Sequence, residues 1–149
     1  MPTARSVTIA EGVEFDTVAR EWRCKWSPDD EKASLVEAQK ALESVLDEVK
    51  GVDGVKGVER IVCGGCLDFK VITSLGADEF GAWEEAGFKP EADFVAKLKD
   101  IDGISMIETQ TFTVRTLRES FVHADWAAYL NRNPLASHKS SFLLCSTFQ

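Results

Sequence analysis

One short pattern occurs twice in the chain, and it constrains the fold more than any other feature. Residues 52–59 (Val-Asp-Gly-Val-Lys-Gly-Val-Glu) match residues 101–108 (Ile-Asp-Gly-Ile-Ser-Met-Ile-Glu). The apolar positions before each copy correspond as well: Val45 with Phe94, Leu46 with Val95 and Val49 with Leu98. Because glycine can adopt the left-handed conformation that closes a helix, each copy predicts a helix, a turn and a strand. The sequence therefore predicts a structural duplication.

The segments around the repeat predict the order of the other elements. Residues 18–26 alternate between apolar and polar types, apart from Arg20 on the apolar side, which is typical of a strand with one buried face. Ser27-Pro28-Asp29-Asp30 has the features of a helix start: a capping serine, a proline and two acids. We expect helices up to Lys50 and over 90–101, strands over 55–62, 67–73 and 104–117, and a loop or short irregular helix over 76–90.

This order, βαββαβ, is typical of an α+β domain of ferredoxin-like type. We expect a four-stranded antiparallel sheet with two helices on one face, spanning residues 18–117. An N-terminal arm (1–17) and a C-terminal extension (118–149) would flank this domain. A large uncovered apolar sheet face usually marks an interface, so we expect a second subunit or the extension to cover the other face. The predicted interface residues are Trp22, Phe112 and Val114.

Composition excludes several classes of protein. The 149 residues suit one domain, and a net charge of −8 with a pI near 4.8 argues against nucleic-acid binding. No stretch approaches the roughly 18 apolar residues of a membrane helix, and the first ten residues lack the apolar core of a secretory signal. Four cysteines do not make a dense disulfide framework. We therefore predict an intracellular protein with reduced thiols, in the cytoplasm or in an organellar stroma or matrix.

Residues Cys63-Gly64-Gly65-Cys66 form a CxxC sequence that allows two interpretations. In redox proteins the first cysteine sits at a helix N-terminus, whereas a strand is expected here. Zinc would need two more ligands, and the remaining candidates show no metal-binding spacing: Cys24, His123, His138 and Cys145. The pattern favours a plain turn, so we predict no metal and no cofactor. Neither histidine has a nucleophile or carboxylate motif beside it, so no catalytic residue is predicted.

The repeat also carries a family resemblance. Gly54-Val55-Lys56-Gly57-Val58, Gly65-Cys66-Leu67-Asp68 and Ile101-Asp102-Gly103-Ile104 with Glu108-Thr109 resemble the effector-binding domain of the Lrp/AsnC family, over about residues 17–117. In that family two domains pair their sheets into a dimeric α/β barrel, and small effectors such as amino acids bind at subunit interfaces. The resemblance implies a homodimer or higher oligomer and a small-molecule effector.

By the same resemblance, Gly65 and Asp68 would line the effector pocket, with Thr109 and Thr111 as neighbours. A carboxylate can hold an ammonium group, and glycine amides can approach a carboxylate closely. The Gly-x-x-Asp pattern also suits an ordinary hairpin, so both interpretations stay open. The regulators of this family carry an N-terminal DNA-binding helix-turn-helix, for which some 17 residues are too few, so direct transcriptional regulation is not expected.

A second resemblance concerns the guanine-nucleotide-exchange domain of elongation factor 1-beta, which has the same βαββαβ order. Gly65 and Lys70 correspond to its Gly-x-x-x-x-Lys segment. Gly64 stands where that family keeps an aromatic residue, and the chain continues well beyond Arg115, the nearest counterpart of its terminal lysine. These departures weaken the expectation of nucleotide exchange.

The sequence favours a non-enzymatic small-molecule-binding or assembly module that works as a homodimer. Three alternatives stay open. The chain could be an accessory subunit that docks on a protein partner through residues 118–149, an oxygenase-like enzyme of dimeric-barrel type, or a nucleotide-exchange domain for a translation GTPase.

Overall fold

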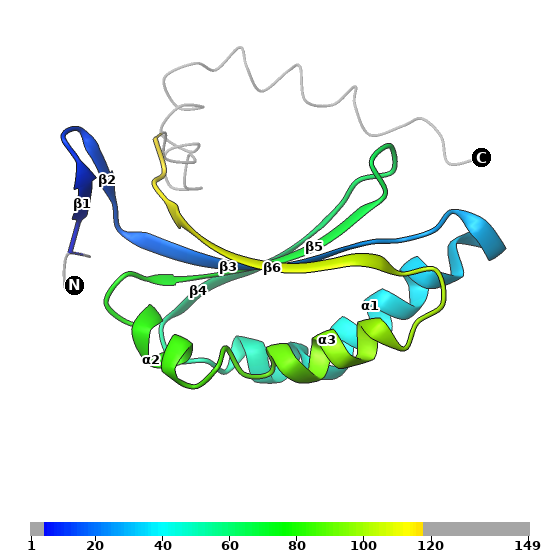
Figure 1. Cartoon of the computed structure of the whole chain (residues 1–149). Helices are drawn as coiled ribbons and strands as arrows, with labels where there is room; N and C mark the ends of the chain where they lie inside the picture. Colours follow the sequence, from blue (N-terminus) through cyan, green and yellow to red (C-terminus); the bar gives the residue numbers. More distant parts are fainter. Residues whose placement is uncertain (1–4, 118–149) are drawn as a thin grey trace, which may run out of the picture. The chain divides into compact units, whose positions relative to one another are not determined.

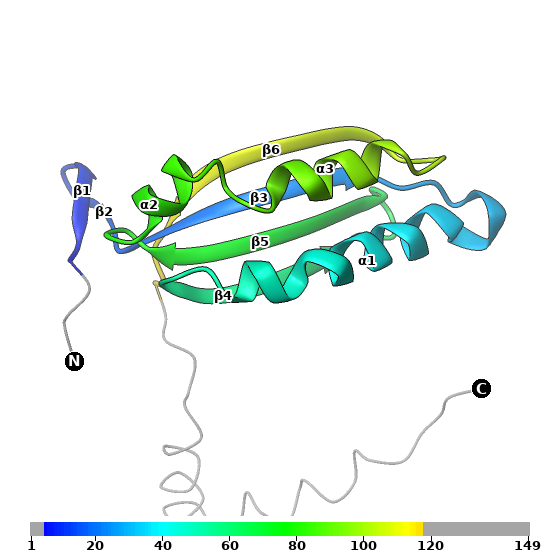
Figure 2. The same ribbon diagram turned by 90° about the horizontal axis from the view of Figure 1, so that it is seen from below.

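The structure, a computed structural model, describes residues 5–117. Its main body is a four-stranded antiparallel sheet with strand order β4-β5-β3-β6 and helices on one face (Figures 1 and 2). The elements along the chain are β1 (Val7–Ala10), β2 (Val13–Phe15), β3 (Thr17–Lys25), α1 (Asp29–Lys50), β4 (Val55–Val62), β5 (Asp68–Gly76), α2 (Phe80–Glu85), α3 (Glu91–Lys99) and β6 (Ser105–Val114). The predicted ferredoxin-like α+β fold is confirmed.

The two copies of the repeat adopt the same local structure. Gly54 and Gly103 have φ values of 81° and 85°, the left-handed conformation expected of them. Turn hydrogen bonds match as well: the amide of Val55 donates to the carbonyl of Val52, and that of Ile104 to Ile101, each at 3.3 Å. The preceding helices repeat their burial, since the pairs Val45 and Phe94, and Val49 and Leu98, are all buried. The duplication is therefore structural as well as sequential.

Helix α1 starts differently from the prediction. The Ser27 hydroxyl accepts a hydrogen bond from the Asp29 amide at 3.1 Å, as a capping serine would. Asp30, Glu31 and Lys32, however, have left-handed φ values of 49°, 54° and 65°. The regular right-handed helix consequently begins only after Lys32.

A two-stranded hairpin, β1–β2, occupies the predicted N-terminal arm. It forms a sheet of its own, and all four residues of β1 are exposed. Gly12 lies in its turn with a φ of 75°. The sequence indicated no strand in this arm, because strands of four and three residues leave almost no periodicity to detect.

The hydrophobic core lies between the sheet and the helices. On β3, the even-numbered residues Trp22 and Cys24 point into this core and are each 1% exposed. Trp22 packs against Phe94 of α3, with ring centroids 5.2 Å apart. In Figure 2, α1 runs along the β4–β5 side of the sheet and α3 along the β3–β6 side. The predicted alternation of β3 is thus confirmed for its helix-covered face.

No helix among residues 5–117 covers the other face, which is the concave upper side of the sheet in Figure 1. We call it the open face. The strand register assigns to it the side chains that alternate with the core residues. Its central members are Ala19, Glu21, Arg23 and Lys25 of β3, Asp68, Lys70 and Ile72 of β5, and Glu108, Gln110, Phe112 and Val114 of β6.

The predicted interface residues divide between the two faces. Phe112 and Val114 pair with Ala19 and Thr17, so they lie on the open face and are partly exposed. Trp22 lies on the helix-covered face, where burial at 1% exposure leaves it almost no surface for a partner. This burial conflicts with the interface role predicted for Trp22, because its ring packs in the hydrophobic core.

The predicted extension 118–149, with His123, His138 and Cys145, lies outside the described residues. Among residues 5–117, no helix is long and apolar enough to cross a membrane.

Candidate functional site

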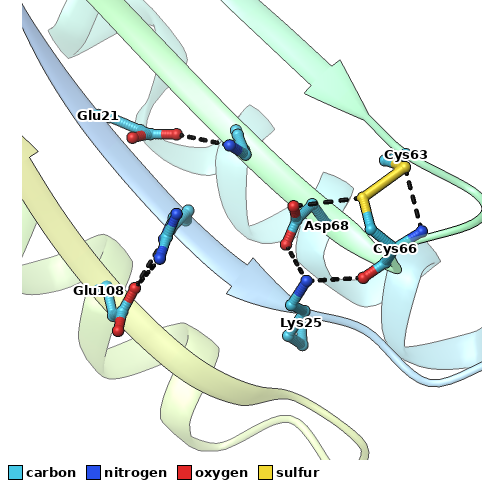
Figure 3. Close-up of polar contacts among 8 residues, drawn as sticks. Glu21, Lys25, Cys63, Cys66, Asp68 and Glu108 are labelled. Atoms are coloured by element: carbon cyan, nitrogen blue, oxygen red, sulfur yellow. Dashed lines mark hydrogen bonds and ion pairs between the residues drawn. A yellow bond between two sulfur atoms is a disulfide. The ribbon is translucent and has the colours of Figure 1, made fainter.

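A row of charged side chains crosses the open face from strand to strand (Figure 3). Lys70 of β5 lies 3.2 Å from Glu21 of β3. Next along β3, Arg23 donates from Nε to Glu108 of β6 at 2.7 Å. At the end of the strand, Lys25 lies 2.6 Å from Asp68 of β5. Three cations and three carboxylates therefore neutralise one another across three strands.

Glu21 is the most buried member of this row. Only 3% of the residue is exposed, although it lies on a face that no described helix covers. Lys70 and Gln110, from the two flanking strands, both contact its carboxylate. A buried carboxylate needs such partners, because removing a charge from water without compensating contacts costs on the order of several kcal/mol.

Asp68, predicted to hold the ammonium group of an effector, already holds one from its own chain. Its carboxylate binds Nζ of Lys25, and this hydrogen bond lowers the pKa of Asp68 below its usual value. Lys25 Nζ also donates to the backbone carbonyl of Cys66 at 2.7 Å. The chain thus supplies the cation that the resemblance assigns to a ligand.

The turn between β4 and β5, residues 63–67, holds the CxxC sequence, and we call it the hairpin tip. Cys63 and Cys66 form a disulfide, whereas reduced thiols were expected. The amide of Cys63 donates to the carbonyl of Asp68 at 2.9 Å and closes the hairpin. The sequence placed a turn here correctly, but spacing alone could not decide the oxidation state of the pair.

Thr109 and Thr111 belong to a different cluster, on the helix-covered face. Both hydroxyls accept hydrogen bonds from the guanidinium of Arg20, at 2.9 and 3.0 Å. Arg20 also makes a bidentate pair with Glu91 at the start of α3, at 2.7 and 2.8 Å. Trp22 donates to the same carboxylate at 2.7 Å. This cluster connects β3, β6 and α3, and each of the three guanidinium nitrogens of Arg20 donates at least one hydrogen bond within it.

The four predicted ligand residues consequently do not form one site within a single chain. Asp68 lies opposite Lys25 on the open face, whereas Thr109 lies opposite Trp22 on the covered face. Gly65 lies at the hairpin tip, beyond the end of β4. Asp68 and the two threonines are therefore on opposite faces of the sheet, because Lys25 and Trp22, their partners on β3, point to opposite faces.

A groove between α1 and the edge strand β4 was not foreseen from the sequence. Its volume is about 530 Å³, within the range of small-molecule sites. Val36 and Val62 remain 50% and 41% exposed along it. Its lining combines apolar and polar side chains: Leu35, Val36, Val62 and Phe69, then Gln39, Lys40, Glu43 and Arg60. We call it the α1–β4 groove.

The polar side chains of the groove differ in whether they have a charged partner. Lys40 pairs with Glu37 at 2.7 Å, and Gln39 donates to Glu43 at 2.9 Å. Arg60 donates to the side-chain oxygen of Gln39 at 2.7 Å. Among residues 5–117, no carboxylate lies within ion-pair distance of Arg60. Within the described part of the chain, the groove therefore presents a guanidinium without an anionic partner beside apolar side chains.

Sequence reasoning found part of this chemistry and missed the rest. Arg20 was noticeable as the one charged residue on the apolar side of its strand, a signal that a buried partner should exist. Arg60 gave no comparable signal, because a charged residue is ordinary on an edge strand. Its place in the groove depends on which side of α1 faces β4, which the sequence does not reveal. Within the described part of the chain, no group of three or more His, Cys, Asp or Glu side chains is arranged to hold a metal ion.

Comparisons with known proteins identify the fold. No protein-family model and no curated protein matches the sequence. A candidate antibiotic biosynthesis monooxygenase from Deinococcus radiodurans superposes with a TM-score of 0.53 at 11% identity, over 70% of this chain and 99% of that one. A variant of SnoaB, a cofactor-independent oxygenase from Streptomyces nogalater, gives 0.50 at 17% identity, over 70% and 99%.

A conserved protein from Methanosarcina mazei gives a TM-score of 0.51 at 9% identity, over 68% of this chain and 95% of that one. At such identities the likeness concerns the backbone alone. The chain therefore shares the ferredoxin-like α+β fold of proteins that include oxygenases.

Proposed function

We propose that this chain is a non-enzymatic small-molecule-binding module that works as a homodimer of α/β-barrel type. The observation that carries the binding function is the α1–β4 groove, with its apolar lining and the guanidinium of Arg60, which has no carboxylate partner among residues 5–117. Such a site suits an amphipathic carboxylic acid, whose anion forms a charge-assisted bond with Arg60 while its apolar part lies on Val36 and Val62. This groove is a different place from the interface pocket at Gly65 and Asp68 that the Lrp/AsnC resemblance implies.

The open face supports the dimer. A chain with a net charge of −8 would repel its own copy if the excess charge lay at the contact. The row on the open face instead pairs each of its cations with a carboxylate, at Glu21–Lys70, Arg23–Glu108 and Lys25–Asp68. Beside this neutral row lie the apolar side chains of Phe112 and Val114. A face of this kind can meet its own copy across a twofold axis.

The dimer is tested by light scattering of the full chain. We expect the mass of a dimer, and we expect Phe112→Glu to shift the protein to monomer because it buries a charge without a partner. Thr113→Glu is the matched control, since Thr113 lies on the same strand but points to the opposite face. A dimer that survives Phe112→Glu would contradict pairing through the open face and would favour docking through residues 118–149.

Ligand binding is tested with a panel of small carboxylic acids, by thermal shift and then by calorimetry. We expect saturable binding that Arg60→Gln weakens at least tenfold, because a charge-assisted bond contributes roughly 1.5–3 kcal/mol. Lys99→Gln removes the same charge from an exposed position of α3 and should leave the affinity unchanged. Binding unaffected by Arg60→Gln would place the ligand elsewhere. Turnover of a bound acid with oxygen would favour the oxygenase-like alternative.

A further inference from the structure

We propose that Cys63 and Cys66 form a redox-active dithiol that exchanges with low-molecular-weight or protein disulfides at the hairpin tip. This activity would be separate from ligand binding in the α1–β4 groove. The two Cα atoms lie 5.6 Å apart, a separation at which a disulfide forms without backbone movement. The Cys63 amide is fixed by its hydrogen bond to the Asp68 carbonyl, so the pair sits on a closed turn.

The two sulfur atoms have different surroundings. The amide of Cys66 donates to Sγ of Cys63 at 3.1 Å, and a hydrogen-bond donor at a sulfur favours its thiolate. Sγ of Cys66 lies 3.3 Å from Oδ2 of Asp68, whose negative charge disfavours a second thiolate there (Figure 3). After reduction the Cys66 thiol can donate to this carboxylate, a bond that the disulfide cannot make. The arrangement therefore assigns the nucleophile to Cys63 and the resolving thiol to Cys66.

Lys25 holds this arrangement in place. Its ammonium group binds Asp68 at 2.6 Å and the Cys66 carbonyl at 2.7 Å, so one side chain fixes both the carboxylate and the turn. The Asp68 carboxyl is charged at neutral pH, since Lys25 lowers its pKa further below an ordinary value that is already acidic. It can therefore act as an acceptor for the Cys66 thiol, and Lys25 is a positioning residue.

The hairpin tip is open to a bulky substrate. Gly64 and Gly65 separate the cysteines, and a Cβ added at either would meet nothing within 4 Å. Cys63 is partly exposed and Cys66 is exposed, whereas Cys24 is 1% exposed and burial raises the pKa of its thiol to about 11. A buried neutral thiol is inert to exchange. Within residues 5–117, the cysteines able to exchange disulfides are therefore confined to the hairpin tip.

The exchange proceeds in two balanced steps. The Cys63 thiolate attacks one sulfur of a substrate disulfide, forms a mixed disulfide and releases the other sulfur as a thiolate. The Cys66 thiol then gives its proton through water to that thiolate, attacks Sγ of Cys63 and displaces the second substrate sulfur, which takes a proton from water. Two electrons pass from the protein dithiol to the substrate, which leaves as two thiols. A reducing dithiol reverses the cycle.

The test uses the full chain in a Cys145→Ser background, because Cys145 lies outside the described residues. Reduced protein is mixed with glutathione disulfide, and thiol adducts are followed by mass spectrometry. We expect wild-type residues 63 and 66 to yield the internal disulfide without a lasting adduct. Cys66→Ser should trap glutathione on Cys63, and Cys63→Ser should react about tenfold or more slowly at Cys66.

Asp68→Asn separates the proposed asymmetry from simple exposure. We expect this variant to raise the alkylation rate of Cys66 toward that of Cys63, while Cys63 changes little. Circular dichroism checks that each variant is folded. Equal adduct rates at Cys63 and Cys66 in the two serine variants, or a wild-type protein that retains glutathione, would overturn the proposal. Either result would leave the dimer and its ligand binding untouched, since those are measured separately.

Discussion

Replacing Glu91 with alanine should reduce the free energy of unfolding by about 3 kcal/mol. Removing one partner of a buried ion pair costs roughly 3–5 kcal/mol, because the remaining charge loses its compensation. The side chains of Arg20 and Glu91 are 13% and 16% exposed, which puts the expected cost at the lower end. The carboxylate also accepts the indole N–H of Trp22, which would lose its partner in the core.

Arg20 would retain part of its surroundings. Thr109 and Thr111 still accept its hydrogen bonds, and its guanidinium lies 4.0 Å from the ring centroid of Phe88. Glu91→Gln should cost less than Glu91→Ala, since an amide oxygen can still accept from Trp22. The exposed pair Lys40–Glu37 provides the control, where Glu37→Ala should change stability by under about 0.5 kcal/mol.

The assay is urea unfolding followed by circular dichroism, with the slope compared between variants. A double variant, Arg20→Leu with Glu91→Leu, should recover part of the loss, because it leaves no buried charge without a partner. Recovery should be incomplete, since the indole N–H of Trp22 still lacks its acceptor. If Glu91→Ala costs less than about 1 kcal/mol, comparable to an exposed ion pair, the cluster does not join α3 to the sheet as we infer.

Three further outcomes are expected from the same unfolding assay. Gly103→Ala should cost more than about 1 kcal/mol, because residue 103 has a φ of 85° and its new Cβ would lie 3.2 Å from the Cβ of Ser27. Gly87→Ala is the control and should cost less, since residue 87 has a φ of 73° but no neighbour within 4 Å of the added Cβ. Phe94→Ala should cost about 3–5 kcal/mol, since the ring is fully buried, and a smaller loss would mean that the core collapses around the cavity. Asp68 has a lowered pKa in the folded state, so its contribution to stability is complete above the unfolded pKa near 4 and is lost as pH falls through the folded pKa. In Asp68→Asn, the free energy of unfolding should therefore fall less steeply on acidification. An unchanged decline would contradict this reasoning.

The duplication made most of the fold predictable. Two Asp-Gly turns, each after a helical apolar stripe, fix two helix ends and the strands that follow, and Gly54 and Gly103 behave as expected. Local physics decides such features, so the sequence can reveal them. The left-handed residues 30–32 were missed, because acids after a proline normally favour a helical first turn.

The candidate site was less predictable, since it depends on register. Asp68 and Thr109 are separated by the sheet only because β5 and β6 pair with β3 at particular residues. A shift of one residue would move every side chain to the other face. Alternation along residues 18–26 placed Trp22 on the buried side of its strand, and the structure agrees. The interface role also predicted for Trp22 conflicts with that burial, whereas Phe112 lies on the open face and its interface role stays a prediction.

The position of β3 has a consequence for how the chain folds. It is the first strand of the main sheet to be synthesised, yet it lies between β5 and β6, and Arg20 pairs with Thr111 near the other end of the described chain. Until β6 leaves the ribosome, β3 keeps one unpaired edge, and a nascent chain is then prone to associate with its neighbours. Contacts this distant in sequence also slow folding. Completion of the sheet therefore waits for the last strand.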